Sequence, residues 1–277
     1  MSTSAKSSSE KPKGSNLFQR LNIRFPWLKL YLVIFIGLVA ILDLLDLTIS
    51  KITNLDQSFP RTPMAKHIKA TDRVLEGKML VALTFDDGPS PSTTPALLDI
   101  LSKKNTLATF FMLGSMAENN PDIVKRIERE GHEIANHTMY HQNLVWLSPE
   151  EIQSDINASK AVFSNIIKRT PALTRPPYGN YNDVVSSIAN TPLILWSVDT
   201  LDWQNRNPET ILNITLNQVH DGAIILLHDI HPTSVEAVPA IIDALRERGY
   251  EFTTVSELAG IRKVKLSAGE GYYNFRP

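Results

Sequence analysis

Between residues 79 and 255, short apolar runs alternate with longer segments whose apolar positions recur at helical spacing. Short apolar runs bounded by turn-forming residues are typical of buried strands. We predict strands at 79–85, 108–113, 132–136, 173–175, 192–198, 223–228 and 250–255. Predicted helices cover 93–104, 121–130, 148–168, 208–219 and 234–248.

Strand and helix alternate about seven times along this segment, and this order is typical of a parallel sheet with helices outside it. A closed barrel and an open doubly wound sheet both satisfy the pattern, with a slight preference for the barrel. The longest predicted helix has a clear start, because Ser148 is a suitable N-cap and Glu151 completes a capping box. No G-x-G-x-x-G motif follows the first strand, so dinucleotide binding has no support.

The N-terminal part of the chain has a different pattern. Residues 1–29 are polar and basic, and the run that follows from Leu30 to Leu42 is apolar and uncharged. Apolar character continues to Ile49, interrupted by acidic residues, and about 20 largely apolar residues are needed to cross a bilayer. We therefore predict a basic cytoplasmic leader followed by a transmembrane signal anchor at 30–49.

Two alternatives to the anchor remain open, a cleaved signal peptide and a buried core helix, although no small-residue Ala-x-Ala cleavage site follows the run. On the anchor and signal-peptide interpretations, the chain after about Ile49 lies outside the cytoplasm. Residues 50–78 show no clear period and are interpreted as a linker. The folded domain is predicted at 79–260, and residues 261–277 are interpreted as a C-terminal tail.

Composition narrows the possible chemistry. Lys and Arg together number 28 and Asp and Glu 29, which argues against a dedicated nucleic-acid binder. The 277-residue chain has no cysteine, so disulfides, thiolate metal sites and a cysteine nucleophile are excluded. Any metal ion must be held by His, Asp or Glu. No motif indicates a protein partner.

Polar residues gather where the predicted strands end. In parallel α/β folds these carboxyl ends lie at one edge of the sheet, where ligands bind. The residues found there are Asp86, Asp87, His137, His141, Arg175, Asp199, Asp202 and His228. A single histidine at a strand end is more often a structural hydrogen-bonding residue. Five strand ends with such residues favour a functional site instead.

His137 and His141 are four residues apart, which places two histidines on one face of a helical turn. With one carboxylate from Asp86 or Asp87 they form a two-histidine, one-carboxylate set that leaves coordination positions for water and substrate. We predict one divalent metal ion, with Zn²⁺ as the default and Co²⁺, Mn²⁺, Fe²⁺ or Ni²⁺ compatible. The neighbouring acid would then be free to accept a proton.

The motifs resemble those of the polysaccharide deacetylases of carbohydrate esterase family 4, which have the NodB-homology domain. Five motifs occur in order over about residues 79–258. They are Thr84-Phe85-Asp86-Asp87-Gly88, His137-Thr138-x-x-His141, Arg175-Pro176-Pro177-Tyr178, Asp199-x-x-Asp202-Trp203 and Leu226-Leu227-His228. The resemblance implies a distorted (β/α) barrel of about seven units, here preceded by the N-terminal membrane segment. It also implies hydrolysis of N-acetyl groups on a polysaccharide of GlcNAc type.

The resemblance also implies roles for individual residues. Asp87, His137 and His141 correspond to the metal ligands. Asp86 corresponds to the general base and His228 to the general acid. Arg175 would orient Asp86, and Asp202 would tune His228. The remaining predicted site residues are Tyr178, whose backbone N–H would contact the oxyanion, and Trp203 and Leu226, which would line the acetyl pocket.

Several substrates fit these motifs. We favour peptidoglycan GlcNAc, because a membrane anchor favours a polymer of the cell envelope. Chitin oligomers, poly-GlcNAc and O-acetylated xylan remain alternatives, as does a non-catalytic carbohydrate-binding module on the same scaffold. The lactam-forming branch that acts on N-acetylmuramic acid is disfavoured, because it commonly lacks the second Asp of the first motif, present here as Asp87.

Overall fold

The computed structural model describes residues 34–39, 41, 43, 75 and 77–277. The predicted leader, most of the predicted anchor and most of the predicted linker therefore lie outside the described residues. Residues 34–39, 41 and 43 are helical and exposed. Within the described ranges, no helix has both the length and the apolar character required to cross a membrane.

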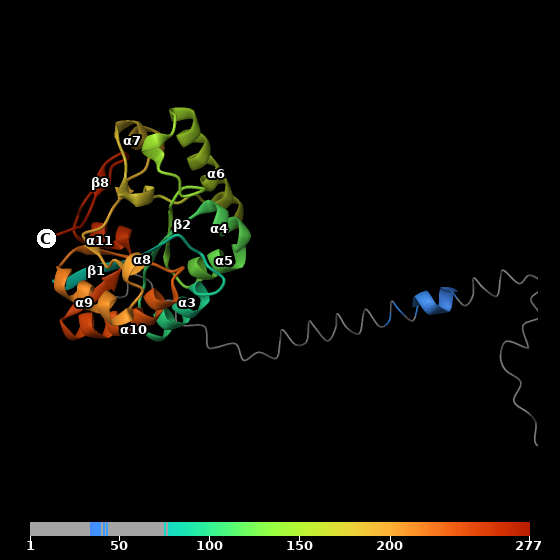
Figure 1. The fold of residues 1–277 in the computed structure, drawn as a ribbon, viewed down its shortest axis with the longest axis horizontal. Coiled ribbons are helices and arrows are strands. Elements are labelled where there is room, and N and C mark those ends of the chain that lie inside the picture. Colours follow the sequence, from blue (N-terminus) through green and yellow to red (C-terminus); the bar gives the residue numbers. More distant parts are fainter. Residues whose placement is uncertain (1–33, 40, 42, 44–74, 76) are drawn as a thin grey trace, which may run out of the picture. The chain divides into compact units, whose positions relative to one another are not determined.

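The domain consists of parallel strands with helices around them (Figure 1). The strands are β1 Met79–Asp86, β2 Thr109–Met112, β3 Glu133–Asn136, β4 Leu193–Ile194, β5 Val198–Asp199, β6 Ala223–His228, β7 Tyr250–Thr253 and β8 Gly271–Tyr272. The α-helices are α3 Thr94–Lys103, α4 Gly114–Asn119, α5 Pro121–Arg129, α6 Pro149–Ile167, α7 Asp183–Ala189, α8 Asp202–Asn205, α9 Pro208–Gln218, α10 Pro232–Glu247 and α11 Val255–Ile261. Two 3₁₀ turns, η2 and η3, cover Leu144–Trp146 and Pro177–Gly179.

The main sheet has the order β3-β2-β1-β6-β5. β6 pairs along one edge of β1, and β2 and β7 pair with successive parts of its other edge. Beyond β3, parallel bridges join Asn136 to Thr174 and Thr174 to Leu193, and β4 then pairs with β8. A bridge from Ala223 to Asn274 connects this side with β6. The parallel α/β prediction is confirmed, and the arrangement fits a distorted, barrel-like fold.

The continuous apolar run of β1 reflects burial on both faces of the strand. Seven of its eight residues are buried. Val81, Leu83 and Phe85 pack in a cluster with the surrounding helices, whereas Leu80 and Ala82 belong to a second cluster in the interior. A strand covered on both faces has no polar face, which is why its sequence does not alternate.

The structure differs from the predicted elements where the strands are shortest. The predicted strand at 173–175 is reduced to one residue, Thr174, which forms a bridge on each side. The predicted strand at 192–198 is two separate strands, because β4 pairs with β8 while β5 pairs with β6. The short helices α4, α7, α8 and α11 were not predicted, since such short segments show little periodicity. The capping box of α6 is present, with Ser148 and Glu151 exchanging backbone and side-chain hydrogen bonds.

Residues 261–277, predicted as a tail, contribute to the fold of the domain. β8 pairs with β4 in parallel. Phe275 is buried in the interior cluster that also contains Leu80, and the ring of Tyr272 lies 5.8 Å from its ring. The segment therefore covers apolar surface that would otherwise be exposed at the short strands.

Candidate metal centre and acid–base site

The register of β1 and β6 places two predicted catalytic groups beside each other. Asp86 and His228 are direct partners at the carboxyl ends of these parallel strands. Asp87 follows with a φ of 74°, a left-handed conformation that turns the chain away from the sheet. Arg175 follows the Thr174 bridge, and His137 follows β3. The predicted convergence of strand ends is therefore observed for these residues.

Asp87, His137 and His141 bring one donor atom each within 4.8 Å of one another. Asp87 Oδ1 lies 3.5 Å from His137 Nε2 and 3.3 Å from His141 Nε2. Ligand atoms held about 2.0–2.1 Å from a zinc ion in tetrahedral geometry lie roughly 3.4 Å apart. Asp87 Oδ1 is buried and accepts no hydrogen bond from the described part of the chain. The donor set therefore fits a divalent cation.

His137 is held in the form that a metal ligand requires. Its Nδ1 lies 2.7 Å from the backbone oxygen of Arg175. A carbonyl oxygen only accepts hydrogen bonds, so Nδ1 carries the proton and Nε2 offers its lone pair toward Asp87. Burial lowers the pKa of His137 to about 3, which keeps the ring neutral.

The four-residue spacing of His137 and His141 predicts a helical turn, and this prediction is wrong. The two histidines lie in a loop in which Thr138 and His141 both have positive φ, 73° and 58°. Side chains hold this loop, because the Met139 N–H donates to Asp155 Oδ1 at 2.7 Å and the His141 N–H donates to Thr138 Oγ1 at 3.2 Å. The buried Asp155 of α6 was not predicted, since a carboxylate in mid-helix has no signal in the sequence.

Asp86 and Arg175 form a buried pair beside the metal ligands. Arg175 donates to Asp86 Oδ1 at 2.7 Å, and Asp86 Oδ2 lies 3.7 Å from His137 Nε2. The guanidinium also donates to the backbone oxygens of Ile194 and Leu195, which fix its orientation. Burial raises the pKa of Asp86, and Arg175 opposes this shift. The result is a carboxylate held in one direction and made more basic than an exposed one.

His228 faces the same site from the other side. Its Nε2 lies 4.0 Å from Asp87 Oδ2, and its Nδ1 lies 2.8 Å from Asp202 Oδ1. Burial alone would lower the pKa of His228, but the hydrogen bond and charge of Asp202 raise it to about 9. Asp202 is itself held by the Ser234 hydroxyl, which donates to Oδ2 at 2.5 Å. His228 is therefore a cation at neutral pH.

The predicted substrate-binding residues differ in exposure. Tyr178 is 62% exposed with a φ of 61°, and its ring lies 4.7 Å from the ring of His141. Trp203 is half exposed in α8, directly after Asp202. Leu226 is buried in β6, two residues before His228, and its backbone oxygen accepts a hydrogen bond from Thr200. Asp199, at the end of β5, accepts a hydrogen bond from the Leu201 N–H.

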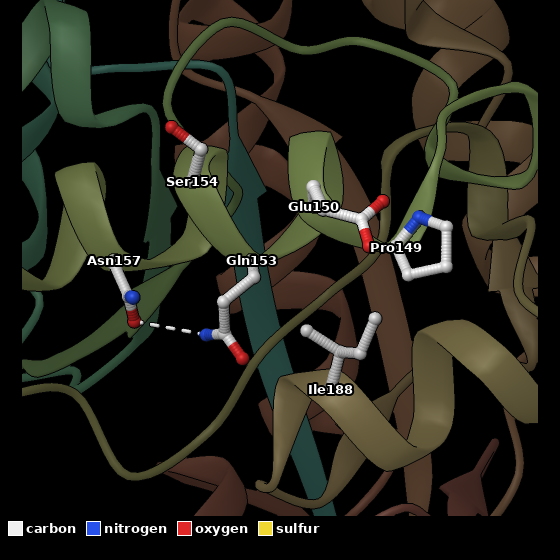
Figure 2. A pocket seen from close by; sticks show the side chains of 6 residues that line it. All are labelled: Pro149, Glu150, Gln153, Ser154, Asn157 and Ile188. Carbon is white, nitrogen blue, oxygen red and sulfur yellow. Dashed lines mark hydrogen bonds between the residues drawn. The ribbon is translucent and has the colours of Figure 1, made fainter.

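A separate pocket lies between α6 and α7, where Ile188 faces the first turns of α6 (Figure 2). None of the predicted catalytic or metal-binding residues lines it. Its other lining residues are Pro149, Glu150, Gln153, Ser154 and Asn157. Glu150 is the one ionisable side chain among these six, so this pocket has no set of groups for metal binding or acid–base chemistry.

Comparisons with known proteins identify the family of this chain. Residues 73–192 match the family model described as polysaccharide deacetylase. The peptidoglycan-N-acetylmuramic acid deacetylase PdaC of Bacillus subtilis (strain 168) is 43% identical over 184 residues, 66% of this chain. The match covers 39% of that relative, so the chain spans about two-fifths of its length.

Two other proteins match over most of their own length. A peptidoglycan-N-acetylglucosamine deacetylase of Bacillus cereus (strain ATCC 14579) is 41% identical over 196 residues, with 68% of this chain and 92% of the relative covered. A solved family 4 acetyl xylan esterase of Clostridium thermocellum, in complex with a cobalt ion, is 34% identical with a TM-score of 0.68. That likeness covers 70% of this chain and 98% of the esterase.

Proposed function

Because this chain belongs to the polysaccharide deacetylase family, we propose that it is a metal-dependent hydrolase that removes N-acetyl groups from GlcNAc residues of peptidoglycan. The observation that carries the proposal is the meeting of Asp87, His137 and His141, with Asp86 beside them and His228 opposite. This arrangement supplies a cation site, a base and an acid together at the carboxyl ends of the parallel strands.

We assign Asp87, His137 and His141 as the ligands of one divalent ion, with Zn²⁺ as the default and Co²⁺, Mn²⁺, Fe²⁺ or Ni²⁺ as alternatives. The cobalt ion recorded with the Clostridium thermocellum esterase supports this range of metals. When bound, such an ion lowers the pKa of water and polarises an acyl oxygen.

Asp86 is the general base of the proposed reaction. It accepts a proton from the attacking water, and Arg175 fixes the carboxylate that performs this step. Its raised pKa improves it as a base, because proton transfer is most effective when the pKa of the base approaches the working pH. Negative charge then develops on the acetyl oxygen, and the backbone N–H of Tyr178 is the proposed donor toward it.

His228 is the general acid. An amine is a poor leaving group unless it is protonated, and a histidine that is cationic at neutral pH can supply that proton. Asp202 holds the Nδ1–H and leaves Nε2 free to donate into the site. Trp203 and Leu226 would line the pocket for the acetyl methyl group. No covalent intermediate is required, which agrees with the absence of a nucleophile motif.

The choice of sugar and polymer rests on the names of relatives. The Bacillus cereus relative is named for N-acetylglucosamine and the Bacillus subtilis relative for N-acetylmuramic acid, both in peptidoglycan. The esterase likeness makes an O-acetyl substrate the second candidate. Deacetylation of GlcNAc exposes an amine that is protonated at neutral pH, so the polymer gains positive charge.

The decisive assay measures acetate release by the purified chain from peptidoglycan, acetylated chito-oligomers and acetylated xylan. We expect release from the first two, loss of activity on chelation and recovery when Zn²⁺ or Co²⁺ is added back. Mass analysis of the muropeptides identifies which sugar has lost its acetyl group. Acetate release from xylan alone would show an O-acetyl esterase instead of an N-deacetylase. Absence of release from all three substrates would refute the proposed hydrolase activity.

We also propose that the catalytic domain lies outside the cytoplasm, anchored through residues 30–49. The support is the apolar run itself, whose described residues 34–39 are helical with exposed apolar side chains. A chain that stays in the membrane fraction after an alkaline wash is expected. Recovery of a shortened, soluble chain would favour cleavage of the leader instead.

A further inference from the structure

The carboxyl group of Asp229 lies against Gly88, the residue that follows the proposed metal ligand Asp87. Asp229 is 1% exposed and has no role in the reaction described above. A Cβ added at Gly88 would overlap the carboxyl group of Asp229, whose atoms are its three nearest neighbours. Backbone and carboxyl group are therefore in direct contact, with no room for a side chain between them.

Thr94, the first residue of α3, holds this carboxyl group. Its hydroxyl donates to Asp229 Oδ2 at 2.5 Å and accepts from the Ser90 N–H at 2.8 Å. Both side chains are buried. The bonds connect the turn after β1 to the residue after β6 through one threonine hydroxyl.

This contact begins where the sheet ends. The β1–β6 ladder ends at the pair Asp86 and His228, so hydrogen bonds between strands fix those two residues. Asp87 lies beyond the ladder with a positive φ, and its direction depends on the turn that follows. Gly88 in that turn is held on one side by the Leu113 N–H, which donates to its backbone oxygen at 3.1 Å, and on the other by Asp229.

We propose that Asp229, held by Thr94, is a positioning residue that fixes the Gly88 turn and thereby aims the Asp87 carboxylate at His137 and His141. This inference rests on the proposed metal site. Groups that orient a metal ligand typically change metal affinity by about 10–100-fold when they are altered. Asp229 and Thr94 would act through Asp87, without themselves binding the metal ion or the substrate.

The test compares Thr94→Val with Thr93→Val in the full chain. Thr93 is the adjacent buried threonine, and its hydroxyl has no hydrogen-bond partner in the described part of the chain. The two variants therefore make the same chemical change at neighbouring positions. Binding of Zn²⁺ to the metal-free protein is measured by calorimetry, and circular dichroism verifies the fold.

We expect Thr94→Val to weaken Zn²⁺ binding by about 10–100-fold. Thr93→Val should leave it unchanged, and Thr94→Ser, which keeps the hydroxyl, should restore it. Excess Zn²⁺ should return most of the kcat of Thr94→Val, whereas a general loss of structure would not respond to metal. Equal affinities in folded Thr94→Val and wild type would overturn the proposal, as would equal losses in both valine variants.

If Thr94→Val does not fold, Gly88→Ala is measured in its place. Its methyl group would push on the Asp229 carboxyl group, so weaker Zn²⁺ binding by a folded protein is again expected. Wild-type affinity in this variant, or failure of both variants to fold, would show a structural contact only. A wild-type protein that binds no Zn²⁺ would instead refute the metal site of the proposed function.

Discussion

His137 and His228 lie at the carboxyl ends of different parallel strands, yet their surroundings make His137 neutral and His228 cationic. His137 donates from Nδ1 to a backbone oxygen, and burial lowers its pKa to about 3. His228 is also buried, but its Nδ1 meets the Asp202 carboxylate, which raises its pKa to about 9. A carbonyl oxygen fixes a tautomer and adds no full charge, whereas a carboxylate stabilises the cation.

This difference separates the two halves of the site. A neutral imidazole with a free lone pair can bind a metal ion, and an imidazolium can donate a proton. The residue type is the same in both places, and the partner of Nδ1 decides its use.

Loss of Asp87 should have the largest effect. Asp87→Ala removes the one carboxylate of the proposed ligand set, so the metal-free protein should no longer bind Zn²⁺ tightly and acetate release should fall to background. Asp86→Asn is the matched control: it should retain Zn²⁺ but lose about 10²–10⁴-fold in kcat, the usual contribution of a general base. Retained metal in the first variant, or normal turnover in the second, contradicts the division of roles between these adjacent residues.

Asp202→Asn should lower the pKa of His228 and so make this histidine neutral, as His137 is. With His228 as the proposed general acid, activity requires its protonated form and is lost as the pH rises through its pKa. Without the carboxylate that pKa falls, so the alkaline limb of the pH–rate profile should move to lower pH. At neutral pH the rate should drop by about 10²-fold.

Zn²⁺ affinity should be unchanged in Asp202→Asn, because Asp202 belongs to the acid half. Ser234→Ala removes one hydrogen bond to Asp202 and keeps its charge, so it should shift the same limb less. An alkaline limb that does not move in Asp202→Asn would show that His228 is not the acid.

His132 should influence stability without affecting turnover. It is buried, its Nδ1 accepts a hydrogen bond from the Ala108 N–H, and burial lowers its pKa to about 4. The unfolded chain therefore binds more protons between about pH 6.5 and 4, so the free energy of unfolding falls as the pH falls through this range, by about 3 kcal/mol at most. Urea unfolding of wild type and His132→Asn at several pH values measures this loss, which should be smaller in the variant. Parallel losses in both proteins would assign the acid sensitivity to other groups.

Much of the site could be predicted because its residues follow strands that are themselves evident in the sequence. Asp86 and His228 end two long apolar runs, so their meeting follows from parallel pairing of those runs. The His137–His141 loop could not be predicted in the same way. Its two left-handed residues lie on either side of Met139, whose N–H is held by Asp155 in the next helix, 16 residues away, and local spacing suggested a helical turn instead.

The sequence by itself determined the features that arise from neighbouring residues, such as the capping box at Ser148 and Glu151 and the unbroken apolar run of β1. Tertiary structure decided the features that depend on partners far apart in the chain. The pairing of β4 with β8 divides one apolar run into two strands, and the contact of Asp229 with Gly88 joins residues 141 positions apart along the chain. Local hydrogen bonds and side-chain periodicity act over a few residues, whereas pKa values, tautomers and ligand directions depend on which distant groups are buried together.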